Sequence, residues 1–130
     1  MHKDTTKEMW DTLENIHEGD KKVKTAKLQV YRAQFENLEM NDDEDIASFF
    51  LRVAEIVNNM KALGETIKEV VIVQKILRSL PPSFNPKVSA IEETYDWETL
   101  TMNQLLGNLT AYEMRLPQKK PSTREATFKT

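Results

Sequence analysis

The sequence predicts an all-α fold from the spacing of its apolar residues and the placing of its glycines. Apolar residues recur at steps of three and four along most of the 130-residue chain, which is the spacing of one helix face. No segment alternates with period two between turn signals, as a half-buried strand would. The three glycines fall at or beside helix ends, apart from Gly107. Because turns of two to four residues redirect the chain, we expect an irregular orthogonal bundle of about six helices.

The first 41 residues predict a pair of helices. Thr5 and Glu8 have the spacing of a capping box, and Gly19 is placed to end the helix that this box begins. The apolar stripe of the first helix is Met9, Trp10, Leu13 and Ile16. The pattern resumes after Gly19 with a second stripe of Val23, Leu28, Tyr31, Phe35 and Leu38.

The next stretch predicts the central helix of the fold. Its buried face would consist of Ile46, Phe49, Phe50, Val53, Val57 and Met60. Asp42 to Asp45 place carboxylates where the free amides and the positive end of the helix dipole favour them, and Gly64 ends the helix. Capping explains this acidic cluster better than a calcium loop, since a calcium loop needs a glycine and a distal bidentate glutamate in register.

Three further helices follow. Thr66 and Glu69 form a capping box for a helix that runs to Leu80, where two prolines stop it. Its buried face would consist of Ile67, Val70, Val71, Val73, Ile76, Leu77 and Leu80. Asn85 and Pro86 predict a short helix with an asparagine N-cap. Thr101 and Gln104 predict the capping box of a last helix, and Leu100 is placed to pack on Leu105 as a hydrophobic staple. Pro117 closes this helix, and residues 117–130 have the composition of a disordered linker.

Composition excludes several classes of site and compartment. The chain has no cysteine and two histidines, which excludes disulfides, thiolate metal sites and cysteine nucleophiles and leaves no convincing metal site. It also has neither an apolar run of membrane-spanning length nor a signal peptide, so we expect no membrane partner and a cytoplasmic or nuclear location.

Charge is distributed unevenly along the chain. The net charge is −3, but the tail after Pro117 holds four basic residues against Glu125, so the remaining body carries −6. The basic residues of the tail are Lys119, Lys120, Arg124 and Lys129. An acidic body repels phosphate, so we expect only weak RNA binding, through this tail. The lysines between residues 21 and 27 could form a phosphate patch, but nearby carboxylates favour a solvated face.

The sequence contains no signature of catalysis. Motifs for nucleotide phosphates, zinc hydrolysis and serine nucleophiles are all absent, so we expect neither an enzyme nor a cofactor or small-molecule substrate. A helix-turn-helix interpretation of residues 67–80 is weak, because Glu65 and Glu69 stand against the few basic residues of the exposed face.

An ordered set of segments resembles a known family. The segments are KEMWDTLENIHEG, KLQVYRAQFENLEM, NNMKALGE, ILRSLPPSFNP and LTMNQLLGNLTAYEMRL. Together they resemble the Gag polypeptide of copia-type LTR retrotransposons from about Thr5 to Leu116. The resemblance implies a retroviral-capsid-like helical fold that self-associates into particles around the element's RNA. It also implies a fragment of Gag, or a host protein derived from one, because the earlier helices and the zinc knuckle of a typical Gag are missing.

The resemblance extends, more distantly, to the major homology region of retroviral capsids. Glu44, Phe49 and Arg52 fit its spacing of acidic, aromatic and arginine residues, whereas Met40 stands where that region usually has glutamine. By this analogy residues 1–41 would end an N-terminal lobe, 42–116 would form a C-terminal lobe and 117–130 a basic tail. We expect the chain before the central helix to fold back, so that Arg52 reaches the turn at residues 41–45 and hydrogen-bonds Glu44 or a nearby carbonyl. The alternative is a solvated arginine.

The apolar stripes hold more surface than six short helices need for one small core, which leaves apolar residues for self-association. The candidates for core or assembly are Trp10, Leu13, Phe35, Phe50, Leu77, Leu80, Pro81, Phe84, Trp97, Leu109 and Tyr112. The expected partner is therefore a second copy of the chain, and a nucleic-acid-binding module that uses the tail is the alternative function.

Overall fold

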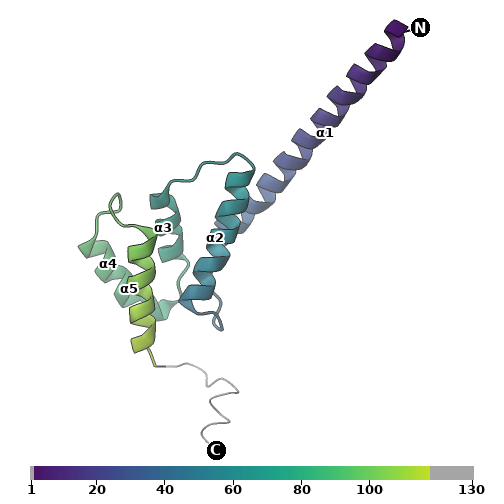
Figure 1. Cartoon of the computed structure of the whole chain (residues 1–130). Coiled ribbons are helices and arrows are strands. Elements are labelled where there is room, and N and C mark those ends of the chain that lie inside the picture. Colours follow the sequence, from purple (N-terminus) through teal and green to yellow (C-terminus); the bar gives the residue numbers. More distant parts are fainter. Residues whose placement is uncertain (1, 118–130) are drawn as a thin grey trace, which may run out of the picture.

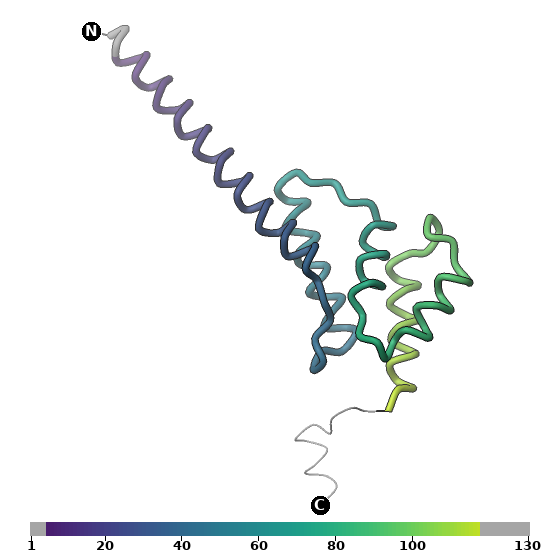
Figure 2. Tube along the Cα trace, turned by 180° about the vertical axis from the view of Figure 1, so that it is seen from behind, coloured from purple at the N-terminus to yellow at the C-terminus, as the bar shows by residue number. Residues whose placement is uncertain are grey.

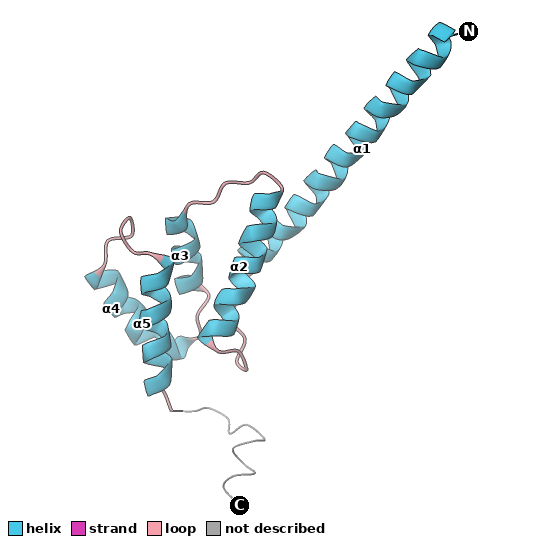
Figure 3. Cartoon of the chain, in the orientation of Figure 1, coloured by secondary structure: helices cyan, strands magenta, loops and turns pink. Residues whose placement is uncertain are grey.

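The structure is a computed structural model that describes residues 2–117. Within this range all regular secondary structure is helical (Figures 1 and 3). It contains α1 (His2–Glu36), α2 (Ile46–Ala62), α3 (Glu69–Arg78), the 3-10 helix η1 (Pro82–Phe84), α4 (Asn85–Thr94) and α5 (Met102–Arg115). The described residues thus hold five α-helices, one fewer than the number expected from the sequence.

The helices α2 to α5 form a body around one apolar core, and the C-terminal part of α1 packs against α2 (Figure 2). Helix α2 is central because α1 covers one of its sides and α5 another. Its predicted apolar face is buried throughout, and Ile56 joins it. Asp45 caps the helix by accepting the N–H of Ser48 at 2.8 Å. Gly64 follows its end with φ of +95°, a conformation that favours glycine.

The predicted break at Gly19 is wrong, because α1 is one continuous helix of 35 residues. Gly19 lies in its interior with no atom near the position of a Cβ. A single glycine costs a helix only about 1 kcal/mol, and the good helix formers on either side of it outweigh that cost. The residues from Thr5 to Lys27 are all exposed, so this part of α1 projects away from the body as a rod (Figure 1).

Three predicted helix starts are also wrong. The box of Thr5 and Glu8 does not begin α1, because the helix already includes His2. Helix α3 begins at Glu69 without a side-chain cap, so Thr66 lies before it. Instead of completing a box with Thr66, Glu69 accepts the N–H of Met102 at 3.4 Å, at the start of α5. Asn85 is the first residue of α4 rather than its cap, because η1 runs directly into that helix. In α3 Ile72 is buried, whereas Val71, expected in the core, is exposed.

The predicted start of α5 is confirmed. Gln104 donates its N–H to Thr101 Oγ1 at 3.1 Å, and Thr101 donates its N–H to Gln104 Oε1 at 3.0 Å. Leu100 and Leu105, the two staple residues, are both buried. Helix α5 lies beside α2 and α3, and its C-terminal end is close to the start of α2.

Candidate functional site

The turn between α1 and α2 holds the charged residues that the sequence singles out. Glu44 donates its N–H to the carbonyl of Asn41 at 3.1 Å, and Asn41 returns its N–H to Glu44 Oε1 at 3.0 Å. These two bonds fold the chain back before α2 begins. The Glu44 carboxylate, which is only 11% exposed, is therefore placed over the first turns of α2.

Arg52 reaches this turn from α2, as predicted. Its Nε donates to Glu44 Oε2 and its Nη2 to Glu44 Oε1, both at 2.9 Å, which makes a bidentate ion pair. Nη2 also donates to the carbonyl of Glu39 at 2.6 Å. The guanidinium carbon lies 5.3 Å from the centre of the Phe49 ring. Glu44, Phe49 and Arg52 therefore meet in one cluster, although the first and last are eight residues apart.

Glu44 and Arg52 shift each other's pKa. The hydrogen bond from Arg52 is the main reason that the pKa of Glu44 is held below its ordinary value of 4.5. The same bond raises the pKa of Arg52. Both partners therefore stay charged at neutral pH and neutralise each other. Such a pair fixes the geometry of the turn and leaves neither group free to transfer a proton.

Met40 occupies the position where a glutamine was expected, and its side chain is buried in the core. Its backbone N–H donates to the carbonyl of Ser79, at the end of α3, at 2.9 Å. At this position an apolar side chain and one backbone bond join the turn to the body. The polar network around Arg52 is therefore built without a side-chain amide at residue 40.

A further carboxylate that the sequence did not suggest completes the start of α2. Glu113, from α5, accepts the N–H of Ile46 at 2.8 Å. The signal was present in the sequence, since Glu113 stands in the apolar stripe between Leu109 and Leu116, where a charge is out of place. Asp45 and Glu113 thus bind two of the free amides at this helix end, and Glu113 links α5 to the turn.

Burial raises the pKa of Glu113 above its ordinary value of 4.5, and the nearby charge of Asp45 adds to this effect, against the hydrogen bond from Ile46. A carboxyl whose folded pKa is raised opposes folding when ionised. This penalty decreases as the pH falls through the folded pKa and is absent below 4.5. We therefore expect Glu113→Gln to be at least as stable as the wild type at pH 7, with the difference vanishing near pH 4.

Glu113→Ala is the contrasting variant. It leaves the N–H of Ile46 without its partner and should lower the free energy of unfolding by about 1 to 2 kcal/mol at pH 7. Urea denaturation at both pH values measures the two effects. If Glu113→Gln were as destabilising as Glu113→Ala, the carboxylate charge itself would stabilise the helix start, contrary to this account.

The other candidate residues divide between the core and the projecting rod. Phe50, Leu77, Phe84 and Leu109 are buried, whereas Phe35, Leu80, Trp97 and Tyr112 are partly buried against the core and Pro81 is half-buried. The Tyr112 hydroxyl donates to the carbonyl of Ser83 at 3.1 Å. Trp10 and Leu13 are exposed and contribute nothing to this core. The tail residues Lys119, Lys120, Arg124 and Lys129 lie outside the described residues.

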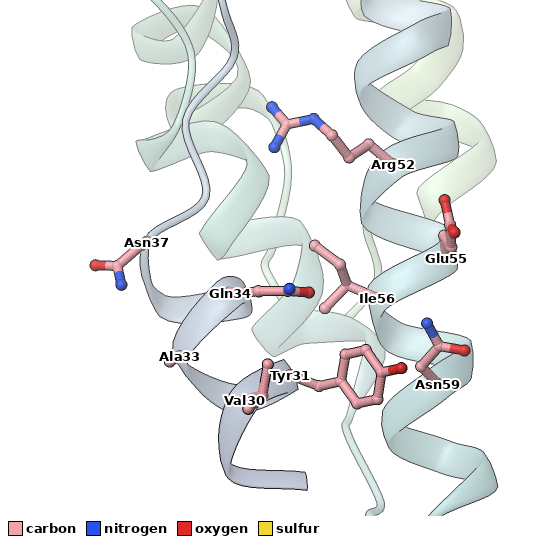
Figure 4. Close-up of a pocket in the computed structure, with 9 residues that line it drawn as sticks. All are labelled: Val30, Tyr31, Ala33, Gln34, Asn37, Arg52, Glu55, Ile56 and Asn59. Atoms are coloured by element: carbon pink, nitrogen blue, oxygen red, sulfur yellow. The ribbon is translucent and has the colours of Figure 1, made fainter. Parts of the chain in front are cut away.

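An open hollow of about 810 Å³ lies between α1 and α2 (Figure 4). It is lined by Val30, Tyr31, Ala33, Gln34, Asn37, Arg52, Glu55, Ile56 and Asn59. Tyr31 and Gln34 point toward α2, and Ile56 points toward α1. The one arginine in this lining is already paired with Glu44, and the lining contains no serine, threonine, cysteine, histidine or lysine.

The described residues contain neither a metal-binding cluster nor a membrane-spanning helix. Among residues 5–117 no group of three or more histidine, aspartate or glutamate side chains is placed to hold a metal ion. No helix in that range combines the length and the apolar character needed to span a membrane.

The comparisons with known proteins identify the family. No curated protein and no solved structure gave a significant match to the chain. The family model of the gag-polypeptide of LTR copia-type matches residues 1–122, which is nearly the whole chain. This protein therefore belongs to the copia-type gag-polypeptide family.

Proposed function

We propose that this chain is a structural assembly domain of a copia-type retrotransposon, or of a host protein derived from one, and that it self-associates into particles that package the element's RNA. Family membership supports a structural role. In this proposal α2 to α5 form a capsid-like lobe, and the Glu44–Arg52 pair fixes the turn by which α1 enters it.

The observation that carries the proposal is the apolar surface of α1. Six large apolar side chains of this helix are more than half exposed, namely Met9, Trp10, Leu13, Ile16, Val23 and Val30. Single exposed apolar residues are normal, but a concentration of them on one projecting element marks a surface that binds another protein. The cluster around Arg52 and the open hollow do not point to another function, since the arginine that they share is already paired with Glu44.

Light scattering across a concentration series tests the proposal. The full chain should change from monomer to a larger species as its concentration rises, and electron microscopy at high salt should show particles. A chain that remains monomeric at millimolar concentration and forms no particles would contradict self-association.

The basic tail favours RNA binding as a second function. Its +3 charge adjoins a body of −6, so binding should reside in residues 117–130 and should weaken steeply as salt rises. A gel-shift assay with a single-stranded RNA should show that deletion of residues 117–130 abolishes the shift. Undiminished binding by the shortened chain would place the RNA site on the body instead.

A further inference from the structure

Helix α1 carries a continuous uncharged row along one side, which we call the seam. The seam consists of Met9, Thr12, Ile16, Gly19, Val23, Ala26, Val30 and Ala33, at alternating steps of three and four. Every seventh residue is large and apolar, and these four side chains are 53–63% exposed. The residues between them are small. The Thr12 hydroxyl donates to the carbonyl of Glu8 at 2.8 Å, so the one polar group in the row has a partner.

The seam lies on the opposite side of α1 from the residues that pack against the core. Leu28, Tyr31 and Phe35 are the residues of α1 that pack against the core. At about 100° per residue, Val30 and Ala33 lie roughly 160° around the helix from that packed face. Figure 4 agrees, since Tyr31 points toward α2 while Ala33 lies on the side of α1 away from it. The seam is exposed from Met9 to Ala33, over about 36 Å at 1.5 Å per residue. Its last two residues, Val30 and Ala33, also line the open hollow between α1 and α2.

An unpartnered helix of this kind needs a second helix. The residues from Thr5 to Lys27 touch no other element enough to be even partly buried. Helices in proteins take most of their stability from packing an apolar face, and this stretch of α1 leaves its apolar face exposed. A seam that repeats every seven residues over three to four heptads is the pattern of a coiled coil.

We propose that α1 pairs with α1 of a second copy as an antiparallel two-stranded coiled coil. The proposal rests on the self-association proposed above and assigns its surface. Large residues then face small ones: Val23 lies opposite Ala26 of the second copy, and Ile16 lies opposite Ala33. Val30 meets Gly19 in the same way, so the two helices can approach closely.

Charges beside the seam select this direction and register. Asp20 and Lys27 flank one edge, and Lys22 flanks the other. With Val23 opposite Ala26, Asp20 meets Lys27 of the second copy, and by symmetry this pair forms twice. A parallel pair would instead place Lys22 beside Lys27 of the second copy, twice. An antiparallel pair shifted by one heptad would bring the two copies of Asp20 together, and likewise the two copies of Lys22.

The first test measures the mass of the full chain by sedimentation across a concentration series. Val23→Glu should raise the dissociation constant at least about tenfold, because it buries a charge in the seam. Thr25→Glu adds the same charge on an exposed part of α1 outside the seam and is the control. Asp20→Lys should weaken association, and adding Lys27→Asp should restore it. Circular dichroism checks that each variant keeps its helix content.

The second test uses the absence of cysteine from the chain. A mixture of Ile16→Cys and Ala33→Cys chains should form a disulfide between different variants, because the proposed register places these positions side by side. Ile16→Cys alone should not cross-link, since its two copies would lie about 25 Å apart along the helices at 1.5 Å per residue. Cross-linking of Ile16→Cys with itself would indicate a parallel pair and overturn the inference.

The outcomes separate the inference from the proposed function. Association that Val23→Glu leaves unchanged would contradict the seam while self-association stands. Failure of the double charge exchange to restore association would contradict the antiparallel register. A wild type that stays monomeric would contradict both proposals.

Discussion

Phe49→Ala should be among the most destabilising single substitutions in this protein, lowering the free energy of unfolding by about 3 to 5 kcal/mol. Phe49 is fully buried in α2, so truncation leaves a cavity in the centre of the core. It also removes the ring beneath the Arg52 guanidinium. Urea denaturation followed by circular dichroism measures the loss.

Leu51→Ala is the matched control for this prediction. Leu51 lies two residues further along α2 and is 72% exposed, so its truncation should change stability by within about 0.5 kcal/mol. Equal effects of the two substitutions would mean that α2 presents a different face to the core from the one described.

The second large effect is expected at the ion pair. Arg52→Ala removes the bidentate bond to Glu44 and the bond to the Glu39 carbonyl, and should cost about 2 kcal/mol, or roughly 5–10 °C in melting temperature. Glu44→Gln should cost less, because the amide oxygen can still accept the N–H of Asn41. The double variant should lose less than the sum of the two, since the residues share one interaction.

The pH dependence of these variants follows from the lowered pKa of Glu44. A carboxyl with a depressed folded pKa contributes stability above its ordinary pKa of 4.5, and this contribution is lost as the pH falls through the folded value. The difference in the free energy of unfolding between the wild type and Arg52→Ala should therefore decrease at acidic pH. Arg115→Ala, at an exposed arginine of α5, is the control.

Two small and independent effects at Glu44 and Arg52 would mean that Arg52 contributes no more than a solvated charge.

Local signals explain why α2 and α5 could be predicted well from the sequence. The Thr101–Gln104 box and the periodic face of α2 depend on residues within one or two turns of each other. The Arg52 contact was predicted for another reason, the resemblance of Glu44, Phe49 and Arg52 to the major homology region. Residues eight apart on a regular helix lie too far apart for direct contact, so the prediction required a turn before α2.

The errors arose where distant residues or weak local preferences decide the outcome. Glu69 turns to α5 instead of Thr66, and Glu113 reaches α2 across 67 positions of sequence. The charge within the apolar stripe marks Glu113 as unusual, but no local pattern identifies the partner of either carboxylate. Gly19 looked like a helix end, but one glycine costs a helix only about 1 kcal/mol, which the helix formers on either side of it outweigh. Along the exposed rod of α1 no neighbouring element redirects the chain.

Hydrogen exchange of the full chain at two protein concentrations tests most directly whether α1 is an assembly helix. Its amides between Thr5 and Lys27 have no support from the body, so in the monomer they should exchange rapidly by local unfolding. At high concentration we expect these amides to gain protection, while amides in the centre of α2 stay equally protected throughout. Protection of α1 that does not depend on protein concentration would contradict the account.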